Sequence, residues 1–255
     1  MKWKFTSWKW LIAYGVILYL LFLVISLPAN VVWSLAPQQL KHGVIVSNLQ
    51  GSAWSASADS IIVNGFELGK SNWTLNPLLL FVGKLGGHIT VHNAMSEVQS
   101  GFAIQTDQLV ELSNLTGEFN AAMLDPAFRP FTFAGIIKSD LDTLELQRKA
   151  RLMATGTLQW NNASISGVQE VALGNVLLNA SPEAKGTRFQ VSNEGGLIAI
   201  SGDIRVAGNG RYTLNLLLSN RDKQRTDINT ILSVLGRLDA QSRVRLNQQG
   251  MLQGW

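Results

Sequence analysis

The chain has 255 residues, no cysteine and a formal net charge of +4. Its length suits one large domain or two small ones, and the absence of cysteine excludes disulfides, cysteine-ligated zinc and thiol catalysis. Lys2, Lys4 and Lys9 are the only charges in the first thirty residues, which leaves a net charge of +1 for residues 31–255. Because no block of like charges follows, the sequence lacks the basic stripe of a nucleic-acid-binding protein, and we expect no nucleic-acid partner.

An uncharged apolar run extends from Trp10 to Leu27. As a helix these residues would rise about 27 Å, close to the hydrocarbon thickness of a bilayer. Lysines precede the run and the first charge after it is Lys41. The positive-inside rule then predicts a cytoplasmic tail over residues 1–9, a transmembrane helix over 10–27 and an exported part over 28–255.

A cleaved signal peptide is the alternative for this segment. The apolar region of a signal peptide has about 7–15 residues and ends at a small-x-small site. This run is longer, and Pro37 follows the best cleavage candidate, Ser34-Leu35-Ala36. We therefore favour an uncleaved membrane anchor.

Short segments with alternating apolar and polar residues fill the exported part and predict a mainly β fold. In residues 198–218 the apolar side chains are even-numbered on both sides of the turn Gly208-Asn209-Gly210. With Phe189 and Val191 upstream, this pattern predicts three antiparallel strands that each have one polar face. Residues 77–82 are a short helix or a buried strand, and residues 120–128 are a further turn of helix.

Helical spacing outside the apolar run is clear only near the C-terminus. Residues 228–238 place apolar side chains at i, i+3, i+4, i+7 and i+10, which predicts a short amphipathic helix. Thr226 or Asp227 precedes this pattern as a candidate N-cap.

The chain contains an internal echo. Gly51-Ser52-Ala53-Trp54 is followed by Leu68-Gly69, and Gly156 to Trp160 is followed by Leu173-Gly174, with an offset of about 105 residues. The echo predicts two related antiparallel β units, over residues 46–150 and 151–255. A chance match in a glycine-rich chain is the alternative.

No catalytic, metal or cofactor site is predicted. His88 and His92 share one face of a predicted strand, but a metal site needs a third ligand from elsewhere, and two polar residues on a solvated strand face are commoner. Nucleophile-elbow, phosphate-loop and zincin motifs are absent from the sequence. We interpret Trp54 and Trp160 as packing residues rather than ligand-stacking residues. A charged segment joins the two units and is interpreted as solvated; its residues are Asp140, Asp142, Glu145, Arg148, Lys149 and Arg151.

Three segments together resemble the type II secretion system protein N family, also called general secretion pathway protein N. Residues 49–58 resemble its Leu-x-Gly-Thr-x-Trp-x-Gly-x-Ala opening, through Gly51 and Trp54. Residues 73–85 resemble its Trp-x-Leu-x-Pro-x-x-Leu-x-x-Gly-x-Leu segment, through Trp73, Pro77 and Gly83. Gly156 and Trp160 are similar to its second half. Ala56 stands where the family pattern has glycine.

The resemblance implies a bitopic inner-membrane protein whose bulk is periplasmic. It would act without cofactor or catalytic residue as a structural subunit that helps folded proteins leave the periplasm, with other inner-membrane and periplasmic secretion subunits as partners. The family is also similar to AsmA-type proteins with curved sheets. This supplies an alternative, a lipid-handling groove protein whose groove is lined by the even-numbered face of residues 198–218. Closure of that face by the 227–238 helix or by the other unit would contradict the alternative. A periplasmic hydrolase that uses His88 or His92 is a third hypothesis.

Overall fold

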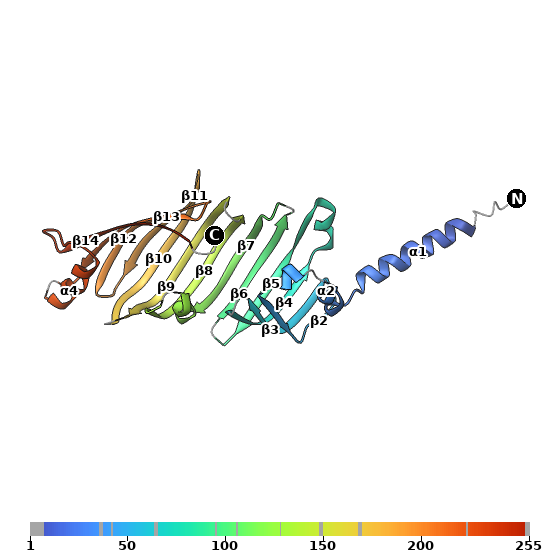
Figure 1. Ribbon diagram of the computed structural model, residues 1–255, viewed down its shortest axis with the longest axis horizontal. Helices are drawn as coiled ribbons and strands as arrows, with labels where there is room; N and C mark the ends of the chain where they lie inside the picture. Colours follow the sequence, from blue (N-terminus) through green and yellow to red (C-terminus); the bar gives the residue numbers. More distant parts are fainter. Residues whose placement is uncertain are drawn as a thin grey trace.

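One long antiparallel sheet makes up most of the molecule (Figure 1). The computed structural model describes residues 8–35, 38–41, 43–63, 66–94, 96–105, 107–127, 129–147, 150–167, 170–222 and 224–252. Each strand pairs with its neighbours in sequence order from β3 to β14, while β1 and β2 both pair with β3. The prediction of a mainly β fold is therefore confirmed, and the described strands form a single continuous sheet.

The strands of the first half are β1 (Val44–Ser47), β2 (Gln50–Gly51), β3 (Ser55–Val63), β4 (Phe66–Leu75), β5 (Lys84–Asn93), β6 (Ser96–Gln105), β7 (Val110–Asn120) and β8 (Thr132–Gln147). Those of the second half are β9 (Arg151–Ser166), β10 (Glu170–Glu183), β11 (Gly186–Glu194), β12 (Ile198–Ala207), β13 (Arg211–Asn220) and β14 (Arg243–Met251). The helices are α1 (Trp8–Ile25), α2 (Ala29–Leu35), α3 (Gln38–Lys41), α4 (Thr226–Leu235) and the two 3₁₀ helices η1 (Pro77–Val82) and η2 (Ala121–Ala127).

The predicted meander of residues 188–218 is confirmed as β11, β12 and β13. Ile204 pairs with Leu214 on one face, and Asp203 pairs with Asn215 on the other. The alternation of apolar and polar residues thus becomes one apolar and one polar face of the sheet, because side chains along a strand point to opposite faces. The turn closes where Gly210 N donates to Ala207 O at 2.9 Å.

The two predicted units lie in one sheet without a break, since β8 and β9 pair along their length. Their local structures nevertheless correspond. Gly69 and Gly174 both adopt positive φ, +85° and +77°, beside register shifts of their strands. In each copy the carbonyl of the preceding leucine accepts a hydrogen bond from an asparagine side chain near the end of the next strand. These likenesses support the repeat, which stays a prediction.

The core lies on the apolar face of the sheet from β8 to β14. The sheet curves so strongly there that β9 approaches β11 and β12 as well as its paired neighbours. Three clusters of buried side chains follow this curve, and α4 covers the last of them. A single sheet therefore buries its apolar face partly against itself, and a second layer is needed only at the C-terminal end.

The sequence prediction of a membrane span over residues 10–27 falls mainly on α1. The observed helix starts at Trp8 and ends at Ile25, because the chain then turns and Pro28 forms a bridge with Ser52. Within the described ranges, no helix has the length and apolarity needed to cross a bilayer. Lys2 and Lys4 lie outside the described residues, and Lys9 lies in the first turn of α1.

Candidate functional site

A row of polar residues crosses the sheet on the face opposite the core. Strand register places one polar residue from each strand from β2 to β14 in a line, and we call this line the polar row. Its members are Gln50, Ser57, Asn72, Thr90, Gln99, Thr116, Asp140, Thr157, Asn179, Gln190, Asp203, Asn215 and Asn247. The whole width of the sheet therefore offers hydrogen-bonding groups on one face.

The polar row forms the floor of a groove of about 820 Å³ over β5 to β9. Three carboxylates line it, those of Glu97, Glu118 and Asp140, against the single ammonium group of Lys138. Lys138 donates to Glu118 on the neighbouring strand. Because the carboxylates outnumber the ammonium group, the groove is acidic and suits a partner rich in hydrogen-bond donors or positive charge.

The two histidines share the same face, as predicted, but they do not form a metal or catalytic site. Both are exposed, and His92 Nδ1 lies 4.0 Å from Glu97 Oε2. In the described part of the chain, no group of three or more His, Asp or Glu residues gathers closely enough to hold a metal ion. In the predicted charged segment Glu145 forms an ion pair with Arg151, and Arg148 and Lys149 lie outside the described residues.

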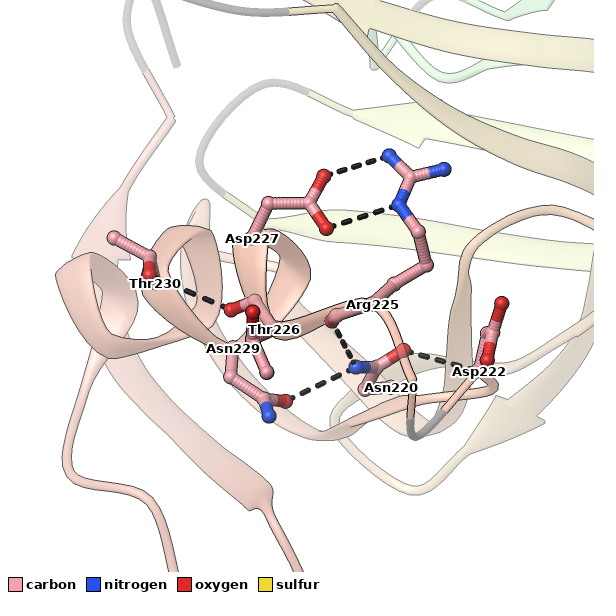
Figure 2. Close-up of polar contacts among 7 residues, drawn as sticks. All are labelled: Asn220, Asp222, Arg225, Thr226, Asp227, Asn229 and Thr230. Atoms are coloured by element: carbon pink, nitrogen blue, oxygen red, sulfur yellow. Dashed lines mark hydrogen bonds and ion pairs between the residues drawn. The ribbon is translucent and has the colours of Figure 1, made fainter.

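A polar network holds the start of α4 against the end of β13 (Figure 2). Asn220 Nδ2 donates to Arg225 O at 2.8 Å and to Asn229 Oδ1 at 3.1 Å. Arg225 donates to both carboxylate oxygens of Asp227, and these hydrogen bonds, followed by the nearby charge, lower the pKa of Asp227. The predicted N-cap at Thr226 or Asp227 is wrong, because Arg225 occupies that position without a side-chain cap and Asp227 instead pairs with it.

The amphipathic helix predicted over residues 227–238 is α4, and it closes the apolar face at its C-terminal end. In α4, the side chains of Ile228 and Leu232 are 1% and 0% exposed. They pack on Ile198, Leu218 and Val244. The helix ends three residues before Leu238, which instead forms a bridge with Val244. Of the proposed lining of a lipid groove, α4 therefore covers the end formed by Ile198, Ile200, Leu216 and Leu218, and Ile204 and Leu214 lie outside the cluster under the helix.

The first sequence motif joins the sheet to α1. Gly51 has φ +95°, and a Cβ there would lie 2.4 Å from Ser55 O, so only glycine allows this tight turn. The turn presents Ala53 and Trp54 to the end of the helical segment. Ala53 N donates to Leu27 O at 2.7 Å, and the Trp54 indole donates to Val24 O at 2.8 Å. The sheet therefore has a hydrogen-bonded junction with the last turn of α1.

A family model described as type II secretion system (T2SS), protein N, matches residues 42–247, most of the chain. The chain belongs to this family. A curated relative, the Type II secretion system protein N of Vibrio cholerae serotype O1 (strain ATCC 39315 / El Tor Inaba N16961), is 22% identical over 239 residues, which cover 90% of this chain and 92% of the relative. No solved structure matches the chain. The chain is thus a type II secretion component of the cell envelope, in a family of structural secretion proteins rather than a known enzyme family.

In this protein N family member, the motif residues of the second half shape the backbone. Gly156 has φ +127°, and a Cβ there would lie 2.4 Å from Asp140 O, at the point where β8 and β9 shift register. Trp160 donates from Nε1 to Ala134 O at 2.9 Å, and its ring centroid lies 5.9 Å from that of Phe133. The indole N–H of Trp160 is therefore hydrogen-bonded to the backbone, as expected for a packing residue.

Sequence reasoning missed the polar row and the junction with α1. The polar row was present in each strand as alternation, but alignment of the strands needs their register, and bulges shift that register in four of the pairings. Ala56, which departs from the family pattern, is buried, and its Cα lies 3.0 Å from where a Cβ on Gly51 would be. The close backbone contact thus occurs at Gly51.

Proposed function

We propose that this chain is a non-catalytic subunit of the type II secretion machinery that is anchored in the inner membrane by α1, with a cytoplasmic N-terminus and a periplasmic sheet. It helps folded proteins cross the outer membrane by binding other inner-membrane and periplasmic subunits. The family match carries the role in secretion. The uncharged run behind Lys9, whose described side chains are exposed around α1, supports the anchor.

The groove over the polar row is the surface that best suits a subunit partner. It is wide, exposed to solvent and acidic, whereas the apolar face of the C-terminal half is curled on itself and covered at its end by α4. Exposed carboxylates and amides bring specificity and fast association rather than bulk affinity. A basic or donor-rich segment of another secretion subunit fits this groove.

Photocrosslinking in intact cells tests the proposed function. A photoreactive amino acid replaces Gln99, which is exposed in the polar row, or Gln248, which is exposed on the opposite face of the sheet. We expect residue 99 to crosslink to a secretion subunit and residue 248 to give no such product. Gln99→Arg should reduce exoprotein release without changing the level of the chain, and Gln248→Arg should not.

Deletion of the gene is the broader test. Loss of exoprotein release from the deletion strain, restored by the wild-type chain, is the expected result. Unchanged release together with no crosslinked secretion subunit at residue 99 would contradict the proposal. The cover that α4 provides at one end of the apolar face argues against the lipid-groove alternative. A metal-dependent hydrolase lacks support, because no group of three His, Asp or Glu residues in the described part of the chain could hold a metal ion.

A further inference from the structure

We infer that η1 and α2 form an apolar rim that rests in the lipid surface beside α1, so that the sheet is held against the membrane at two further points. This inference rests on the membrane anchoring proposed above. In η1, Leu78, Phe81 and Val82 are 69%, 85% and 68% exposed. These are large apolar side chains in consecutive turns, and a soluble surface rarely gathers such side chains without a partner.

The second family segment builds η1 so that these side chains point outward. The Asn76 side chain accepts a hydrogen bond from Leu78 N at 3.0 Å, Pro77 begins the helix, and Gly83 ends it with φ +71°. Leu79 turns inward: its Cδ1 lies 2.7 Å from the position that a Cβ on Gly86 would take. One leucine therefore fixes η1 to the sheet, and its neighbours are left outside.

The position of η1 beside the end of α1 favours a membrane as the partner. Leu75, next to η1, donates from its N to Trp54 O at 2.7 Å, and the Trp54 indole donates to Val24 O in the last turn of α1. One residue, Trp54, therefore links the start of η1 to the end of the apolar helix. Figure 1 shows α1 projecting from the β1–β4 end of the sheet, away from α4.

The short helix α2 adds a second apolar segment at the same end. Ala29 is buried, whereas Val31, Val32 and Leu35 are exposed, Leu35 at 79%. Neither α2 nor η1 contains a charged residue. A protein interface of this size would carry a polar rim and charged neighbours for specificity. Two uncharged apolar segments that flank an apolar helix instead fit the interfacial region of a bilayer.

The absence of cysteine allows a direct test by single-site spin labelling. Phe81→Cys reports on the rim. Val234→Cys on α4 is the matched control, because Val234 is a helical apolar residue with 84% exposure at the opposite end of the sheet. Ile17→Cys, in the middle of α1, reports on the anchor. The full-length chain is reconstituted into vesicles of phosphatidylethanolamine and phosphatidylglycerol, and the accessibility of each nitroxide to oxygen and to a water-soluble nickel chelate is measured.

We expect the ratio of oxygen to nickel accessibility to be severalfold higher at residue 81 than at residue 234, with the highest ratio at residue 17. Leu78→Cys repeats the measurement at a second rim position in case the first variant does not fold. A water-like label at residue 81 with a lipid-like label at residue 17 overturns the rim and leaves the anchor intact. A label at residue 81 that is shielded from both reagents also overturns the inference, since it indicates a protein partner. A water-like label at residue 17 overturns the anchor and the rim together, whereas the crosslinking at residue 99 still tests the secretion role.

Discussion

Leu232→Ala in α4 decides whether the apolar face of the sheet is closed at its C-terminal end. The Leu232 side chain is 0% exposed and packs among Ile198, Leu218, Ile228 and Val244. The substitution removes three buried carbon groups, worth about 2.4 kcal/mol at about 0.8 kcal/mol each. A residual cavity adds to this, so we expect the free energy of unfolding to fall by about 3–4 kcal/mol.

The measurement is urea unfolding of the full-length chain in mild detergent, followed by far-ultraviolet circular dichroism. Val234→Ala is the control, because Val234 is on the same helix but 84% exposed. Its stability should change by no more than about 0.5 kcal/mol, and the better helix propensity of alanine favours a gain. A loss below about 1 kcal/mol for Leu232→Ala would refute the reasoning. It would mean that α4 rests only loosely on the sheet, and the open lipid groove would then regain its lining.

Three further predictions concern the sheet and the base of α4. Thr187→Val should lower the free energy of unfolding in urea by about 2 kcal/mol. The hydroxyl of this buried threonine accepts a hydrogen bond from one backbone N–H of β9 and donates to one backbone carbonyl of β9, and valine leaves both groups unpaired. Gly156→Ala should cost more than Gly83→Ala by about 1–3 kcal/mol, since both positions have positive φ but only at residue 156 would a Cβ meet backbone; equal melting temperatures would contradict this. Hydrogen bonds from Arg225 lower the pKa of Asp227 below its unfolded value, so the stabilisation is present above about pH 4 and is lost as the pH falls through the folded pKa. Asp227→Asn should accordingly lower the melting temperature slightly at pH 7, and a difference that persists at strongly acid pH would argue against the pair.

The local elements could be predicted from sequence because each leaves a periodic signal. The alternation in residues 198–218 gave the meander, and the spacing from Ile228 gave α4. The predicted cap of α4 was wrong, because Arg225, the residue before the helix, occupies the N-cap position and donates to the carboxylate of Asp227. The position of Arg225 depends on the hydrogen bonds of Asn220, which bring the end of β13 against α4. These contacts leave no periodic pattern in the sequence.

The long-range features were out of reach for a different physical reason. Whether the apolar face is a core or a groove depends on how far the sheet curls. The approach of β9 to β12 is accompanied by register shifts and positive-φ glycines in this part of the sheet, and bulges bend strands. The hydrogen bond of Trp54 was likewise not predictable from the sequence. A tryptophan at the start of a strand indicates packing, but nothing in residues 49–58 shows that its indole binds the carbonyl of Val24.

An open sheet of this width must protect its two edges, and the way it does so bears on how partners bind. At one edge, β1 has only four residues and α3 lies against it. At the other, Leu238 forms a bridge with Val244 on the outer side of β14, and Arg243 and Arg245 place charges along the strand. Short, covered or charged edges oppose the addition of a further strand. In the C-terminal half of the sheet the apolar face is also occupied, by the curvature of the sheet and by α4. The polar row and the rim beside α1 are the surfaces that we propose for recognition. The first suits a polar segment of another subunit and the second suits a bilayer, so the two can be engaged at the same time.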